Sequence, residues 1–202
     1  MIALIDYGAG NLGSVYKAFR FIGADIDVTA DPQTVARADA VVLPGVGAFA
    51  HCMRGLEAVS LTEATKQFIC SGRPFLGICV GLQMLFDASE EMGEFPGLGV
   101  LEGKVVRFPS NSLKVPHIGW NELRFRDDAA LFSGLNQGDR VYFVHSYFPE
   151  PADDSVVTAT SDYGGQFCCA VERANVHATQ FHPEKSGAVG LEILRNFNSL
   201  AS

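Results

Sequence analysis

Short apolar runs recur through the first half of the chain, and their length and composition are those of buried β-strands. Ile2-Ala-Leu-Ile5 is the first of these runs, and Phe75-Leu-Gly-Ile78 is the last. Runs this short, bounded by glycine, proline or polar residues, are typical of strands rather than helices. The strands expected in this half lie at residues 2–5, 26–28, 39–43 and 75–78.

Segments with apolar residues at helical spacing separate these strands. After the first strand, one apolar face continues to about Ile22, with Asn11 as a potential cap at its start and Gly23 at its end. The helices expected are residues 11–22, a short helix from Asp31-Pro32, a region 48–71 that breaks near a potential cap at Ser60, and residues 80–86. Strands and helices that alternate in this way predict a parallel sheet covered on both faces.

The second half is rich in strand-like segments. Gly164-Gly165 and Ala174-Asn175 are hairpin turn signals. Strands are expected at residues 105–108, 120–125, 141–145, 156–160, 167–172 and 176–181, and a last helix at about 187–200. The predicted fold class is therefore α/β, with a central, mostly parallel sheet, flanking helices and added antiparallel strands. No linker or repeat interrupts the chain, so residues 1–202 are expected to form one domain.

Composition and charge narrow the classes of function. The chain has 202 residues, of which 48% are hydrophobic and 19% charged, which is enough for a sizeable core. A net charge of −8 without a Lys/Arg cluster makes nucleic acid and anionic membrane poor candidates as partners. The first residues lack a basic region and no apolar stretch has transmembrane length, so we expect no signal peptide and no membrane span. Five cysteines without zinc-binding spacing are then expected to stay reduced in the cytoplasm.

Gly77-Ile-Cys79-Val-Gly81 lies between an expected strand and an expected helix. This is the layout of a nucleophile elbow, with cysteine where many hydrolases carry serine. The glycines remove Cβ atoms that would clash at a sharp turn, and the N-terminus of the following helix would favour the thiolate of Cys79. The alternative is a structural cysteine between a buried strand and a buried helix.

His182-Pro-Glu184 follows another expected strand. An imidazole that accepts the proton of a thiol needs a carboxylate to fix its tautomer, and this tripeptide supplies both groups. The alternative is a histidine at a strand end and a solvated carboxylate. His145 is the one rival as general base, because His51 and His177 lack a carboxylate motif nearby.

Two glycine-rich segments are further candidates. Pro44-Gly-Val-Gly47 follows an expected strand, so an amide near Gly45-Val46 can join the amide of Val80 as a donor to an oxyanion. An ordinary turn is the alternative. Gly8, Gly10 and Gly13 match a dinucleotide-binding pattern only weakly, because no acidic residue follows at the expected distance.

Taken together, the cysteine elbow and the His-Pro-Glu motif resemble the class I, triad-type glutamine amidotransferases and their three-layer fold. Within that family the chain is similar to the glutaminase subunits of imidazole glycerol phosphate synthases. The segments that carry this similarity span nearly the whole chain and are Ile5–Leu12, Leu43–Phe49, His117–Asn121, Tyr142–Tyr147 and Phe181–Ser186. Glutaminases of anthranilate, GMP or carbamoyl phosphate synthesis share the cysteine and His-Pro-Glu motifs, but not usually the first segment or His117–Asn121.

The resemblance implies a role for each matching residue. Cys79 would be the nucleophile, His182 the general acid/base and Glu184 its orienting carboxylate. The oxyanion site would consist of Gly45, Val46 and the Val80 amide. The substrate glutamine would contact Gly47, Gln83, Ser146 and Tyr147. Val80 and Leu82 depart from the commoner Leu and Met, which leaves the amide of Val80 available.

The resemblance also implies a partner, a (β/α)8-barrel cyclase that forms a heterodimer with this chain and receives ammonia through an internal passage. The pair would make imidazole glycerol phosphate and aminoimidazole carboxamide ribotide in histidine biosynthesis, without a cofactor. The matching interface positions are Asn11, Trp120, Tyr142 and Lys185. Core packing is the alternative for Trp120, and a solvated charge is the alternative for Lys185.

Three other functions stay open at this point. The chain could be the glutaminase component of another amidotransferase, an unrelated cysteine hydrolase, or a scaffold protein that binds glutamine without catalysis. If Val46 must turn its N–H inward to complete the oxyanion site, the ligand of the partner could gate the reaction through residues 44–47.

Overall fold

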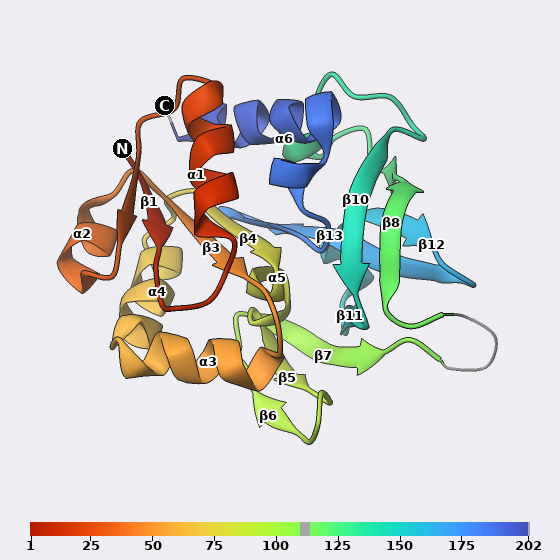
Figure 1. The fold of residues 1–202 in the computed structure, drawn as a ribbon, viewed down its shortest axis with the longest axis horizontal. Coiled ribbons are helices and arrows are strands. Elements are labelled where there is room, and N and C mark those ends of the chain that lie inside the picture. Colours follow the sequence, from red (N-terminus) through yellow and green to blue (C-terminus); the bar gives the residue numbers. More distant parts are fainter. Residues whose placement is uncertain (110–113, 202) are drawn as a thin grey trace.

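An eight-stranded sheet forms the centre of the computed structural model, which describes residues 1–109 and 114–201 (Figure 1). In spatial order its strands are β2 (Ile26–Thr29), β1 (Ile2–Ile5), β3 (Ala40–Gly45), β4 (Phe75–Cys79), β14 (Val176–Thr179), β13 (Gln166–Arg173), β12 (Val157–Asp162) and β9 (Arg124–Phe125). The pairs from β2 to β14 are parallel, and those from β14 to β9 are antiparallel. The predicted α/β class with added antiparallel strands is confirmed.

Helices cover this sheet on both faces. Helices α1 (Leu12–Phe21) and α6 (Gly187–Leu200) lie together on one face, where the rings of Phe19 and Phe197 meet edge to face at 6.2 Å. The other face carries α2 (Pro32–Arg37), α3 (Phe49–Ala58) and α4 (Leu61–Cys70). Strands β3 and β4 are consequently buried at every position, as their continuous apolar runs predict.

Two smaller sheets pack beside the large one. Strands β8 (His117–Glu122) and β10 (Arg140–His145) form an antiparallel pair. The second small sheet has the order β11 (Tyr147–Pro151), β7 (Leu101–Arg107), β5 (Phe86–Ser89) and β6 (Phe95–Pro96). The sequence predicts neither β5 nor β6, since both are short and neither shows a clear alternation of apolar and polar residues.

The helix predicted at residues 80–86 is wrong in its length. Helix α5 (Val80–Gln83) has one turn, and the chain then enters β5. The carbonyl oxygens of Met84 and Leu85 accept hydrogen bonds from Leu98, Val100 and Leu101, so they are not available to continue the helix. Tertiary pairing has therefore overridden an apolar, helix-like sequence.

Other boundaries also differ from the prediction. The expected strand 120–125 is two strands, because the buried Leu123 separates β8, which pairs with β10, from β9, which pairs with β12. Strand β14 ends at Thr179 and does not reach Phe181. The break at Ser60 is confirmed, but Ser60 adopts a left-handed conformation and neither it nor Asn11 forms a side-chain cap. The described part of the chain also contains the 3₁₀ turns η1 (Ala130–Phe132), η2 (Asp154–Val156) and η3 (Pro183–Lys185).

Candidate active site

The predicted nucleophile lies on the turn between β4 and α5. Cys79 adopts φ 56° and ψ −111°, a conformation that side chains rarely accept. A Cβ atom on Gly81 would lie 2.0 Å from the carbonyl oxygen of Leu43, and one on Gly77 would lie 2.8 Å from the carbonyl oxygen of Gly81. The glycines therefore permit close approach of backbones, while Cys79 itself has the strained conformation. Because α5 has a single turn, its dipole is weaker than that of the longer helix expected from the sequence.

Three strand ends meet at this turn. Strands β3, β4 and β14 are adjacent and parallel, with Gly45 paired to Cys79 and Thr179 paired to Ile78 (Figure 1). Parallel neighbours end at the same edge of a sheet, where open α/β sheets bind ligands. Segments 44–47, 79–81 and 180–184 thus come together as predicted.

His182 and Glu184 form a buried pair. Nδ1 of His182 lies 2.8 Å from Oε1 of Glu184, and the two side chains are only 2% and 1% exposed. Nε2 of His182 is buried and has no hydrogen-bond partner among residues 1–109 and 114–201, so it is free to exchange a proton with another group. Ser186, which the sequence analysis missed, fixes this segment by donating to the His182 carbonyl and accepting from the Tyr142 amide, at 2.7 and 2.9 Å.

The pKa of His182 indicates how this pair interacts with the cysteine. Burial acts to lower the pKa of the imidazole, but the nearby Cys79 thiolate and then Glu184 outweigh it, and the pKa is raised to about 10. The imidazolium is therefore the favoured form at neutral pH when Cys79 is ionised. Geometry and charge together allow a thiolate–imidazolium pair, the arrangement required for nucleophilic attack by a thiol.

A cavity of about 580 Å³ opens above these groups. It is lined by Gly10, Asn11, Val46, Gly47, Cys79, Val80, Gln83, Glu91, Pro116, Val144, His145, Ser146, Tyr147, His182 and Lys185. Gly45 is the one predicted oxyanion or substrate residue outside this lining. A Cβ atom there would lie 2.8 Å from both the Gly81 amide nitrogen and Val80 Cβ, so Gly45 serves close packing of the turn.

Side chains beside the cavity hold the end of β3 and the loop that follows it. The buried hydroxyl of Tyr7 donates to the Pro44 carbonyl at 2.6 Å, and the Cys52 thiol donates to the Val46 carbonyl at 3.4 Å. Gly47 has φ +88°, which its lack of a side chain permits. The loop is thus fixed at two carbonyl groups next to the predicted oxyanion donors.

Two polar residues of the cavity region were not identified from the sequence. Gln180 is fully buried, and its Nε2 donates to Sγ of Cys79 at 3.7 Å. Glu91 lines the cavity and accepts from the amide of Phe49 at 2.6 Å. The Gln-Phe-His-Pro-Glu segment contains a signal for Gln180, since a polar residue at a buried strand end needs a partner.

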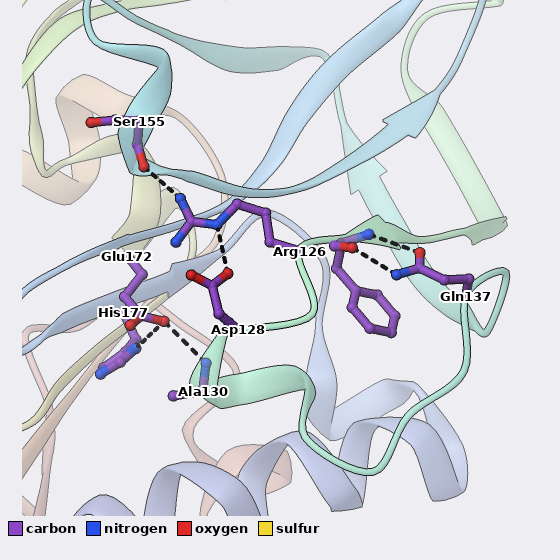
Figure 2. A network of polar contacts seen from close by, with 8 residues as sticks. Arg126, Asp128, Ala130, Gln137, Ser155, Glu172 and His177 are labelled. Carbon is purple, nitrogen blue, oxygen red and sulfur yellow. Dashed lines mark hydrogen bonds and ion pairs between the residues drawn. The ribbon is translucent and has the colours of Figure 1, made fainter.

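The remaining histidines are not general bases in this arrangement. His145 has both ring nitrogens in hydrogen bonds, to the Tyr147 carbonyl at 2.8 Å and to His117 at 3.0 Å, and burial lowers its pKa to about 3. His177 corrects the sequence analysis, because it does have a carboxylate nearby. Its Nδ1 lies 3.4 Å from Oε2 of Glu172 on the neighbouring strand, and that oxygen also accepts from the Ala130 amide (Figure 2).

The predicted interface residues lie beside the cavity. Trp120 is 54% exposed, so it is not a core residue, and its ring meets that of Tyr142 at 6.2 Å. The ammonium group of Lys185 lies 6.0 Å from the centre of the Tyr142 ring, and Lys185 and Asn11 both line the cavity. Ile118, for which the sequence gives no such indication, is 58% exposed on the same strand as Trp120.

The described residues contain neither a cluster of metal-binding side chains nor a membrane-spanning helix. Within residues 1–109 and 114–201, no group of three or more His, Cys, Asp and Glu side chains is placed to hold a metal ion. None of the helices in that part of the chain has the length and apolar character needed to cross a membrane.

Comparison with known proteins agrees with this geometry. A family model described as glutamine amidotransferase class-I matches residues 3–199. The imidazole glycerol phosphate synthase subunit HisH of Syntrophotalea carbinolica is 55% identical over 206 residues, covering 99% of this chain and 100% of the relative. The protein of the same name from Methanothermobacter thermautotrophicus is 53% identical over 197 residues, covering 98% and 97%.

Solved structures show the same fold at low identity. A crystal structure of a glutamine amidotransferase has a TM-score of 0.78 at 20% identity and covers 100% of this chain and 99% of its own. The crystal structure of a glutamine amidotransferase from Thermotoga maritima has a TM-score of 0.66 at 21% identity, covering 91% of this chain and 75% of its own.

Proposed function

The chain belongs to the class I glutamine amidotransferase family, and from this membership we propose that it hydrolyses glutamine to glutamate and ammonia for a cyclase in histidine biosynthesis. The relatives named as HisH subunits, about half identical over nearly their whole length, support this assignment. The observation that carries the chemistry is the meeting of Cys79 with the buried His182–Glu184 pair at the cavity.

In the proposed reaction the thiolate of Cys79 attacks the side-chain amide carbon of glutamine. The resulting tetrahedral oxyanion receives hydrogen bonds from the Val80 amide and from an amide of the Gly45–Val46 segment. Imidazolium His182 gives its proton to the departing ammonia, which leaves a γ-glutamyl thioester. Neutral His182 then takes a proton from water, and the hydroxide releases glutamate and restores the thiolate. Glu184 keeps the proton of Nδ1 in place through both steps.

The cavity lining supports a way of holding the substrate. The four residues predicted to contact glutamine, Gly47, Gln83, Ser146 and Tyr147, all line this cavity, which supports our placing glutamine there. Glutamine carries an α-ammonium group. Among the lining residues that the structure describes, Glu91 is the only carboxylate, so we assign Glu91 to that charge. Glu91 also caps α3 through the Phe49 amide, and this contact connects substrate binding to the loop after β3.

Ammonia is useful only beside an acceptor site, and the relatives are named as subunits of a synthase. We therefore assign residues 1–202, as one glutaminase domain, to a heterodimer with a (β/α)8-barrel cyclase that receives ammonia through an internal passage. The proposed contact surface consists of the exposed Trp120, of Asn11 and Lys185, which line the cavity, and of Tyr142, whose ring lies beside Lys185. We expect a protein with this biosynthetic role in the cytoplasm.

Labelling with a diazo-ketone analogue of glutamine tests the nucleophile, with and without the cyclase. Mass spectrometry is expected to find one adduct, on Cys79, and none in the Cys79→Ser variant. Cys70 is the built-in control, because its thiol is exposed but distant from His182 in sequence and in no cavity described above. An adduct on Cys52 or Cys70, or glutamine turnover by Cys79→Ser, contradicts the assignment.

A further inference from the structure

A buried pair of histidines, one of which lines the cavity, takes no part in the proposed reaction. His117 on β8 and His145 on β10 are 3% and 6% exposed, and Nδ1 of His117 lies 3.0 Å from Nε2 of His145. The pair is enclosed by aromatic rings, those of Phe108, Phe143, Tyr163 and Phe167. A polar pair retained inside an apolar cage is costly unless each nitrogen has a partner.

The partners fix the direction of these hydrogen bonds. Nδ1 of His145 lies 2.8 Å from the Tyr147 carbonyl oxygen, which only accepts, so this nitrogen must carry the proton. Burial keeps His145 neutral, and its Nε2 is then an acceptor for an N–H on Nδ1 of His117. Nε2 of His117 in turn accepts from Nδ2 of Asn121 at 3.4 Å. Each ring thus has one proton, on Nδ1.

The chain of hydrogen bonds continues from the Tyr147 carbonyl to the nucleophile. The same carbonyl accepts from Nε2 of Gln83 at 3.0 Å, and Nε2 of Gln83 also donates to Oε1 of Gln180 at 3.0 Å. With its oxygen engaged, Gln180 must turn Nε2 the other way, and that nitrogen donates to Sγ of Cys79 at 3.7 Å. The amide orientation of Gln180 follows from Gln83, and that of Gln83 from the Tyr147 carbonyl.

We propose that the histidine pair is a positioning element of the active site, which acts through the Tyr147 carbonyl and Gln83 to hold the side-chain N–H of Gln180 on the sulfur of Cys79. Gln180 is the group that touches the reacting atom, and it stabilises the thiolate by a charge-assisted hydrogen bond. His117 and His145 contribute no proton to the reaction. The proposal deepens the proposed glutaminase function and rests on it.

The tautomers give a test in the unmodified protein. Nuclear magnetic resonance of the full chain with ¹⁵N-labelled histidine, at neutral pH, is expected to show His117 and His145 neutral and protonated at Nδ1. The His117→Phe and His145→Asn variants assign the signals. A proton on Nε2 of His145, or a doubly protonated ring, is incompatible with the hydrogen-bond directions given above and overturns the proposal.

Substitutions at His145 separate positioning from packing. His145→Leu removes the donor to the Tyr147 carbonyl, and His145→Asn keeps an N–H near the position of Nδ1. Glutamine turnover by the complex with the cyclase is expected to fall about tenfold in kcat/KM for His145→Leu, and to recover largely in His145→Asn. Tyr163→Phe is the matched control. It loses a hydrogen bond to the Lys114 carbonyl within the same aromatic cage, but that bond does not belong to the series of hydrogen bonds that leads to Cys79. Equal losses in all three variants mean that packing alone matters.

Gln180→Leu in the full chain tests the last hydrogen bond of the series, from Gln180 to the sulfur of Cys79. Alkylation of Cys79 by iodoacetamide at neutral pH, followed by peptide mass spectrometry, is expected to slow about tenfold, equivalent to about 1.4 kcal/mol. An unchanged alkylation rate refutes the role of Gln180. This measurement therefore keeps the proposal testable even if His145→Leu does not fold. If Cys79→Ser abolishes turnover while the Gln180 and His145 variants behave as wild type, only the positioning proposal fails. Turnover by Cys79→Ser would instead remove the proposed function.

Discussion

Replacement of Gly81 by alanine tests the geometry of the elbow more directly than replacement of a catalytic side chain. The added Cβ would lie 2.0 Å from the Leu43 carbonyl oxygen and 3.0 Å from its carbonyl carbon. Both atoms belong to the backbone of a buried strand, so no flexible side chain can move aside. Either β3 or α5 must shift by roughly 1 Å to restore a normal contact.

The size of the effect follows from that shift. Overpacking a core by extra carbon atoms costs about 1–3 kcal/mol, and a backbone clash belongs at the upper end, so we expect a loss of about 3 kcal/mol. For a chain of this length that corresponds to a fall in Tm of about 6–12 °C. A displacement of about 1 Å at Cys79 or at the loop after β3 is also expected to reduce turnover about 100-fold.

Urea unfolding and glutamine turnover measure the two effects on the same sample. Gly13→Ala is the matched control, because Gly13 is exposed in helix α1 with nothing within 4 Å of the added Cβ. That change is expected to leave stability equal or raise it by about 0.5–1 kcal/mol. If Gly81→Ala unfolds within about 0.5 kcal/mol of wild type, the close approach of α5 to β3 is refuted.

Three further predictions concern the same site. Tyr7→Phe removes the hydroxyl that donates to the buried Pro44 carbonyl at 2.6 Å. Urea unfolding is therefore expected to show a free energy of unfolding lower by about 1–3 kcal/mol, and glutamine turnover is expected to fall. An unchanged free energy of unfolding and unchanged turnover would exclude a role for this bond. Glu184→Gln is expected to lower kcat about 10⁴-fold, because an amide no longer fixes the tautomer of His182. The rate of ammonia release from glutamine measures kcat, and KM should change little. The pKa of His182 is raised from 6.5 to about 10, so the folded state holds this proton more tightly than the unfolded state does. The resulting contribution to the free energy of unfolding is full below about pH 6.5 and is lost as the pH rises through about 10. Urea unfolding at increasing pH should show that loss in wild type but not in His182→Gln.

Much of the fold can be predicted because the parallel strands are buried on both faces. Their apolar runs and the helices between them give the order of elements from β1 to β4, and a glycine-flanked cysteine at the end of β4 indicates the elbow. The roles of Cys79, His182 and Glu184 stay predictions, but the structure brings the three residues together as those roles require.

The parts that could not be predicted depend on contacts between distant segments. Helix α5 is short because residues 98–101 take its next carbonyl groups, and no local pattern records that pairing. Gln180 and the partner of His177 were missed for a similar reason, since each acts across neighbouring strands rather than along the sequence. Hydrophobic pattern indicates which residues are buried, whereas the partner of a buried polar group depends on strand order.

The position of β14 has a consequence for synthesis of the protein. This strand is made after every other described strand but lies in the interior of the sheet, between β4 and β13. Until residues 176–179 have left the ribosome, the apolar strand β4 has a bare edge, open to pairing with other chains. His182 follows directly in the sequence, so a nascent or truncated chain that lacks this segment exposes the apolar edge of β4 and also lacks the residue proposed as the base of Cys79. From the role proposed for His182, we expect completion of the sheet and the onset of glutamine hydrolysis to coincide, and a chain that lacks this segment to release no ammonia.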